Sequence, residues 1–125
     1  MKLFLFIFIT TFFVLESKGQ NSYEYNINGF PIDSINAQYI TAEVCNLTLS
    51  TKVFLELDYG QETKFLNNRL KRVADKRGDY VEFKSNMDAL NFLSSLGFQL
   101  IDTNYIRVKD DDIRAIFLLK KMVRD

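Results

Sequence analysis

Alternating apolar and polar residues mark two consecutive segments as strands. In residues 38–45, Ile40, Ala42 and Val44 occupy every second position, and the same alternation returns in residues 52–59. A period of two with one apolar face predicts antiparallel strands whose other face is in water. The connection 46–51 is short enough for a hairpin. Glu56 and Asp58 are therefore expected as solvated carboxylates on the polar face of the second strand.

The pattern changes to helical spacing after Ser85. Ser85 followed by Asp88 resembles a capping box, which starts a helix, and Gly97 stands where a left-handed residue would end it. This spacing predicts one main helix over residues 86–96. Its expected buried stripe consists of Met87, Ala89, Leu90, Leu93 and Leu96.

The remainder of the chain is expected to form further strands. Residues 98–101, 105–108 and 113–120 have strand-like patterns, and the last is apolar on nearly both faces, which predicts a central strand. Asp110, Asp111 and Asp112 form a polar turn before it.

Residues 61–77 are ambiguous, since their apolar spacing also fits a helix. We favour a hairpin that turns at residues 75–78 and returns along residues 80–83, with Gly78 supplying a positive φ angle. These patterns together predict an α+β domain, with a mainly antiparallel sheet of four to six strands and one main helix packed on one face.

The N-terminus has the features of a signal peptide. A short positive start precedes an apolar run over residues 3–15, which is short of the roughly 20 residues that span a bilayer, and small residues precede Gln20. We expect residues 1–19 to be a cleavable signal peptide, with an uncleaved anchor as the alternative. Residues 20–36 then read as a flexible arm and residues 37–125 as a single domain, secreted or periplasmic, with no membrane span after cleavage.

Composition excludes several classes of function. Sixteen basic and sixteen acidic residues give no net charge, which argues against a nucleic-acid partner. The absence of histidine removes the commonest general base and metal ligand. Cys45 is the only cysteine, so no disulfide can form within the chain, and it is expected to be a small core residue on a strand.

No motif assigns a catalytic, cofactor-binding or metal-binding residue. The residues after Asp110, Asp111 and Asp112 lack the glycine and distal glutamate of a calcium loop, and the glycines do not have the spacing of a phosphate-binding loop. Glu56 and Asp58 are the carboxylates on which a hydrolase alternative would depend.

The central part of the chain resembles a known group of proteins. The sequences DYGQ at residues 58–61, FKSNMDALNF at residues 83–92 and LGF at residues 96–98 resemble motifs of small secreted, uncharacterised proteins from Bacteroidetes. Phe98 stands where that group usually has tryptophan. The resemblance implies a bacterial envelope protein with the fold predicted above; it carries no catalytic residue, because no activity is established for the group.

The sequence therefore predicts an exported small module that acts by binding and is more likely not an enzyme, with an unknown protein or envelope component as its partner. Two alternatives remain open. One is a carboxylate-dependent hydrolase of the cell envelope, and the other is a protein that adds a strand to a partner chain, because the sheet must have edges.

Overall fold

The computed structural model describes residues 24–46, 50–62 and 71–122. In chain order, its elements are β1 (Tyr25–Ile27), β2 (Phe30–Pro31), the 3-10 helix η1 (Ile32–Ser34), β3 (Tyr39–Asn46), β4 (Val53–Asp58), β5 (Val73–Asp75), α1 (Asn86–Ser95), β6 (Phe98–Lys109) and β7 (Asp112–Lys121). The predicted signal peptide lies outside these residues. No helix in the described ranges is long and apolar enough to cross a membrane.

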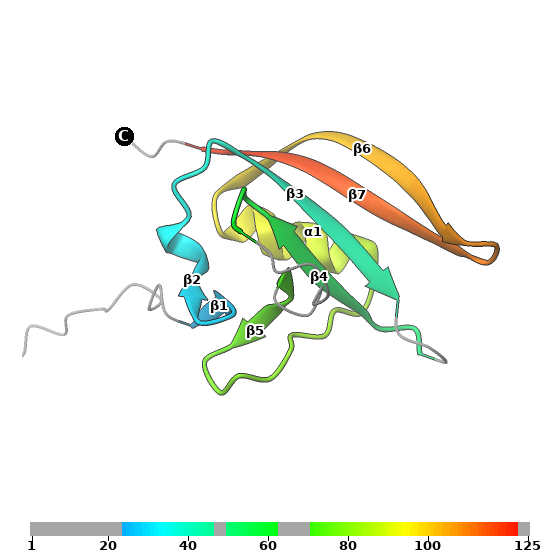
Figure 1. Cartoon of the computed structure of the whole chain (residues 1–125), viewed down its shortest axis with the longest axis horizontal. Helices are drawn as coiled ribbons and strands as arrows, with labels where there is room; N and C mark the ends of the chain where they lie inside the picture. The colour runs from blue at the N-terminus through cyan, green and yellow to red at the C-terminus, as the bar shows by residue number, and fades with distance from the viewer. Residues whose placement is uncertain (1–23, 47–49, 63–70, 123–125) are drawn as a thin grey trace, which may run out of the picture.

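The strands form two antiparallel sheets rather than the single sheet that the sequence predicted. The larger sheet has the order β4-β3-β7-β6, and the smaller has the order β2-β1-β5 (Figure 1). A mainly antiparallel α+β fold with one main helix is confirmed. The count of sheets differs because β1 pairs with β2 on one side and with β5 on the other, instead of extending the larger sheet.

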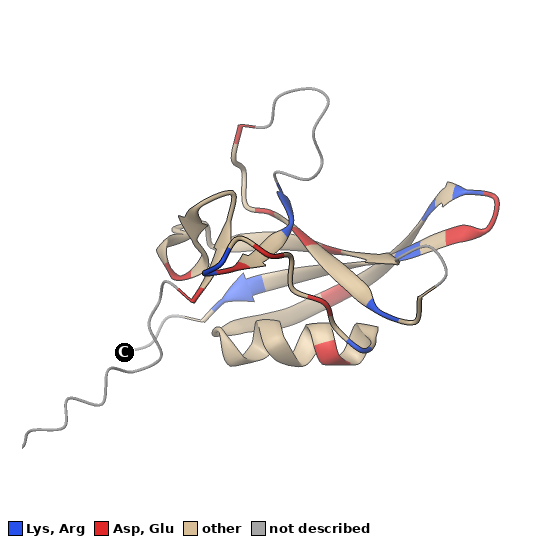
Figure 2. Ribbon diagram, turned by 90° about the horizontal axis from the view of Figure 1, so that it is seen from below, with Lys and Arg blue, Asp and Glu red and all other residues tan. Residues whose placement is uncertain are grey.

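The main core lies between α1 and the larger sheet (Figures 1 and 2). Alternation directs Ile40, Ala42 and Val44 of β3 toward the core, and Ala115, Phe117 and Leu119 of β7 do the same. Ala89 and Leu93 complete the core from the helix. As predicted, β7 is a central strand, flanked by β3 and β6.

The segment before β3 belongs to the core, which corrects the expectation of a flexible arm for the described residues 24–36. Ile27, Ile32 and Ile35 are fully buried in the same apolar cluster as Leu93. Asn28 and Gly29 form the turn between β1 and β2, with φ angles of 51° and 84°. Three isolated isoleucines without a strand or helix period gave no signal in the sequence, although their burial is complete.

The ends of α1 are as predicted. The Ser85 hydroxyl accepts a hydrogen bond from the Asp88 amide at 3.1 Å, and Gly97 has a φ of 92° after the last turn. The predicted stripe needs one correction: Met87 is 62% exposed. At about 100° per residue, Met87 lies roughly 200° around the helix from the buried Ala89, so it faces solvent.

The predicted strands 98–101 and 105–108 are parts of one long strand, β6. The polar residues at 102–104, which suggested a break, are tolerated because β6 is the outermost strand of its sheet and is exposed along most of its length. Irregular pairing with β7 occurs around Ile101 and Val108. Asp110 and Asp111 form the turn of the β6–β7 hairpin, whereas Asp112, which was expected in this turn, is the first residue of β7.

The hairpin that follows residue 71 is present, but its return side is not a continuous strand. β5 turns through Gly78, whose φ is 87°, and Ala74 forms an isolated bridge with Tyr80. Phe83 leaves this hairpin and pairs instead with Val53 of β4. Residues 63–70, where the sequence left a helix possible, lie outside the described residues.

Candidate functional site

Two features of the described residues could carry function. The first is a charged cluster on the sheet face opposite α1, built from β3, β4 and β7. The second is the free edge of β6 with the groove between β6 and α1. We describe the charged cluster first, because it contains Glu56, a residue on which the hydrolase alternative depends.

Glu56 is buried, which corrects the expectation of a solvated carboxylate. It is 7% exposed, and its Oε1 lies 3.3 Å from Nε of Arg72. The Arg72 guanidinium also lies over the rings of Phe54 and Tyr80, at 4.9 and 5.5 Å from their centroids. β4 is therefore covered on both faces, and the carboxylate is neutralised within the fold.

Asp58 lies on the same face of β4 as Glu56 but in a different environment. Its side chain is about half exposed, and its Oδ2 lies 3.8 Å from Nζ of Lys71. The structure thus places the two candidate hydrolase carboxylates in separate ion pairs. A general acid must be free to exchange a proton with a substrate, and this pairing gives no support to that role for Glu56.

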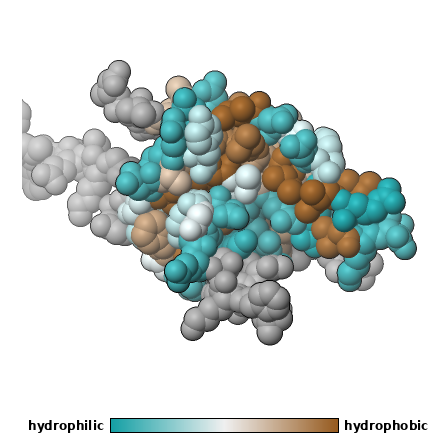
Figure 3. Space-filling view, turned by 45° about the horizontal axis from the view of Figure 1, so that its top comes forward, coloured by the Kyte–Doolittle hydropathy of each residue, from teal (hydrophilic) through white to brown (hydrophobic). Residues whose placement is uncertain are grey.

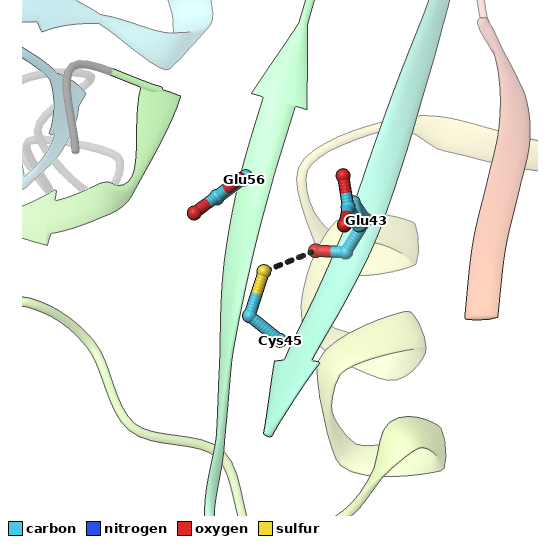
Figure 4. A group of neighbouring side chains, drawn as sticks. All are labelled: Glu43, Cys45 and Glu56. Carbon is cyan, nitrogen blue, oxygen red and sulfur yellow. Dashed lines mark hydrogen bonds between the residues drawn. The ribbon is translucent and has the colours of Figure 1, made fainter. Parts of the chain in front are cut away.

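Cys45 lies beside the carboxylates of Glu43 and Glu56 (Figure 4). One ligand atom from each of these residues falls within 4.8 Å of the others, so the three could be considered for a metal ion. Arg114 already occupies this space: its Nη1 lies 3.1 Å from Glu43 Oε1 and 3.6 Å from Cys45 Sγ, and its Nη2 lies 3.1 Å from Asp112.

The cluster is suited to an internal ion-pair network more than to metal binding. A divalent cation would have to displace the guanidinium groups of Arg72 and Arg114 from the carboxylates that they neutralise. Burial, together with the negative charges of Glu56 and Glu43, raises the pKa of the Cys45 thiol to about 12. The Cys45 thiol is therefore protonated at neutral pH. Its burial on β3 confirms the prediction of a small core residue on a strand.

The second feature is the outer edge of β6. At the opposite side of the sheet, the edge of β4 is partly occupied. Val53 and Phe83 exchange two backbone hydrogen bonds of 2.8 Å, and the backbones of Glu56 and Arg72 form an isolated antiparallel β-bridge. In the described part of the chain, no strand pairs with the outer side of β6. Its backbone donors and acceptors on that side are available to another chain.

The β6–β7 hairpin extends past the rest of the domain (Figure 1). Tyr105 pairs with the buried Ala115 and so lies on the helix-facing side of the sheet, yet it is 70% exposed. Val108 and Ile113 are also exposed apolar residues of this hairpin. Figure 3 shows apolar side chains alternating with polar ones over this side of the molecule.

A shallow groove of about 460 Å³ lies where the C-terminal half of α1 meets the start of β6. Its lining contains no charged side chain and consists of Leu90, Asn91, Ser94, Gly97, Phe98, Gln99, Leu100 and Met122. Leu100 and Met122 are partly exposed at its rim, and the neighbouring Ile101 is exposed too. Edge and groove thus form one continuous surface along β6.

Comparison with known proteins gives this surface no precedent: no family model, no curated protein and no solved structure matches the chain. Sequence patterns could not reveal the pairing of Arg114 with Glu43, because these residues lie 71 positions apart. They could not reveal the groove either, because it forms only where the start of β6 and Met122 come to lie beside α1.

Proposed function

We propose that this chain is a non-enzymatic binding module that receives an extended polypeptide segment along the free edge of β6. The observation that carries the proposal is the long outer edge of β6, which lacks a partner among the described strands while the edge of β4 is partly bridged. An extended segment offers backbone donors and acceptors at the same spacing as a strand edge, so it can continue the sheet.

The length of the regular edge sets the size of the expected partner segment. The pairing irregularities at Ile101 and Val108 leave six regular residues between them, 102–107. At about 3.3 Å per residue this stretch is about 20 Å long. A partner strand of five to seven residues, on the order of a typical strand, would match it.

The arrangement of the two sheets agrees with binding along β6, because it leaves β6 as an outer strand. We propose that the expected sheet with one main helix on one face is β4-β3-β7-β6 with α1, and that β2-β1-β5 closes one end of the core. The expected signal peptide and the resemblance to small secreted proteins of Bacteroidetes favour a partner in the cell envelope.

The binding proposal can be tested with a designed strand peptide and edge variants. The probe is acetyl-Lys-Thr-Val-Thr-Leu-Thr-Val-Thr-Lys-amide, titrated calorimetrically into the chain from Gln20 to Asp125, which keeps every described residue. We expect binding that falls at least tenfold in Tyr105→Lys, because a lysine at an exposed edge opposes strand addition.

Two controls isolate the edge. Met87→Lys places the same charge on an exposed residue of α1 and should leave the affinity unchanged. A probe with an N-methyl group on every amide from its second to its eighth residue cannot donate along either side, and it should bind neither the wild type nor the variants. Equal binding of the methylated probe, or equal affinity for both lysine variants, would contradict strand addition.

A further inference from the structure

We infer that the groove between α1 and β6 selects an uncharged, bulky apolar side chain from the segment that pairs with β6. This inference rests on the proposed function and adds the chemistry of the partner to it. The groove lies directly beside Phe98, Gln99 and Leu100 at the start of the strand. A segment that follows β6 toward α1 therefore passes over the groove and can insert a side chain.

The lining determines which side chain fits. Leu90, Phe98, Leu100 and Met122 supply apolar surface, and the polar groups that accompany them are neutral. In Figure 2 the helix is tan, the colour of uncharged residues, except in its first turn, which contains Asp88. This turn is at the end of the helix away from the groove. A charged side chain would lose its water here without gaining a partner, whereas an apolar side chain would remove apolar surface from water, which is favourable.

The same charge pattern disfavours a second copy of this chain as the occupant. Two copies of β6 related by a twofold axis would pair antiparallel about Asn104 or Tyr105. Leu100 would then lie opposite Val108 or Asp110 of the other copy, which brings the charged hairpin end beside the uncharged groove. A heterologous segment with a leucine or phenylalanine opposite Leu100 avoids this conflict.

The test measures selectivity at the two terminal positions of the probe peptide, because a nine-residue probe centred on Asn104 places one of its ends opposite Leu100, beside the groove, in either strand direction. Four versions carry leucine, phenylalanine, aspartate or arginine there, and each is titrated into ¹⁵N-labelled chain 20–125 while backbone amide shifts are recorded. We expect shifts in β6 with leucine and phenylalanine, and at least tenfold weaker binding with aspartate and arginine.

A charge placed in the groove should reverse this selectivity. Ser94 lines the groove in the last turn of α1, where a cation is favourable to the helix. Ser94→Arg should strengthen binding of the aspartate peptide at least fivefold. Ser95→Arg is the matched control, because Ser95 is an adjacent exposed helix residue outside the groove lining, and it should change nothing.

The outcomes separate the inference from the proposed function. Shifts in β6 that are equal for all four peptides, or equal effects of the two arginine variants, overturn the selectivity and leave strand addition standing. Absence of β6 shifts with every peptide overturns both. A peptide-free dimer whose contact maps to β6 would assign the edge to a second copy and overturn the heterologous partner.

Discussion

Arg72 Nε lies 3.3 Å from Glu56 Oε1, and this contact holds a buried carboxylate of β4 in a neutral environment. The same guanidinium covers two aromatic rings, so it closes one side of the sheet as well as balancing the charge. Glu56 is thus part of the framework of the fold, on the edge strand opposite β6.

Replacement of Arg72 by methionine should destabilise the domain. The variant leaves the Glu56 carboxylate buried without its cation. Removal of one partner of a buried ion pair typically costs about 3–5 kcal/mol. We expect a loss of about 3 kcal/mol, because the Arg72 side chain is a quarter exposed. Urea unfolding followed by circular dichroism measures the change. Lys71→Met is the control: it removes the more exposed pair with Asp58 and should cost less than about 1 kcal/mol. Equal losses in the two variants would contradict a framework role specific to Arg72.

Leu93→Ala should lower the free energy of unfolding by about 2–5 kcal/mol, because Leu93 is completely buried between α1 and the sheet. Met87→Ala removes a side chain of similar size from the exposed face of the same helix and should stay within about 0.5 kcal/mol of wild type. Thermal melts of both variants would check the contrast, and a Leu93→Ala melt at the wild-type temperature would refute the core assignment.

The segment before β3 should be essential for stability. Ile35→Ala empties a fully buried position in the shared core and is expected to cost about 2–5 kcal/mol. Asp33→Ala, two residues away on the exposed side of η1, should have little effect. If both variants unfold at the wild-type urea concentration, residues 24–36 do not contribute to the core.

The Cys45 thiol should make stability depend on pH in the alkaline range. Its folded pKa is about 12, raised from an ordinary value of 9.0 mainly by burial, so the folded protein keeps the proton when the unfolded chain has lost it. Stability from this group is complete below pH 9 and is lost between pH 9 and 12. Cys45→Ala should fall less steeply than wild type over that window in urea titrations, and parallel curves would contradict the raised pKa.

Local signals were readable in the sequence and long-range ones were not. The cap at Ser85 and the stop at Gly97 are contacts within a few residues, so their spacing predicted them correctly. The burial of Ile35 depends on packing against distant elements, and nothing periodic announces it. The pairing of Arg72 with Glu56 likewise could not be predicted from the sequence, because it depends on how the two segments lie beside each other in the fold.

The position of β6 explains the remaining differences. An outer strand tolerates polar residues such as Asp102 and Asn104, which in a central strand would be costly, so they suggested a break where none exists. The candidate surface was foreseen only as the general statement that a sheet has edges. Its location on β6, and the groove beside it, depend on the strand order and on where α1 packs.

The central claim is that the β6 edge is where this protein meets its partner. The most direct measurement is photo-crosslinking in cells that naturally make this protein. Benzoylphenylalanine replaces either Tyr105 or Met87, both of which are exposed. We predict a discrete adduct from position 105 and none from position 87. The absence of an adduct at position 105, or the same adduct from both positions, would contradict the claim.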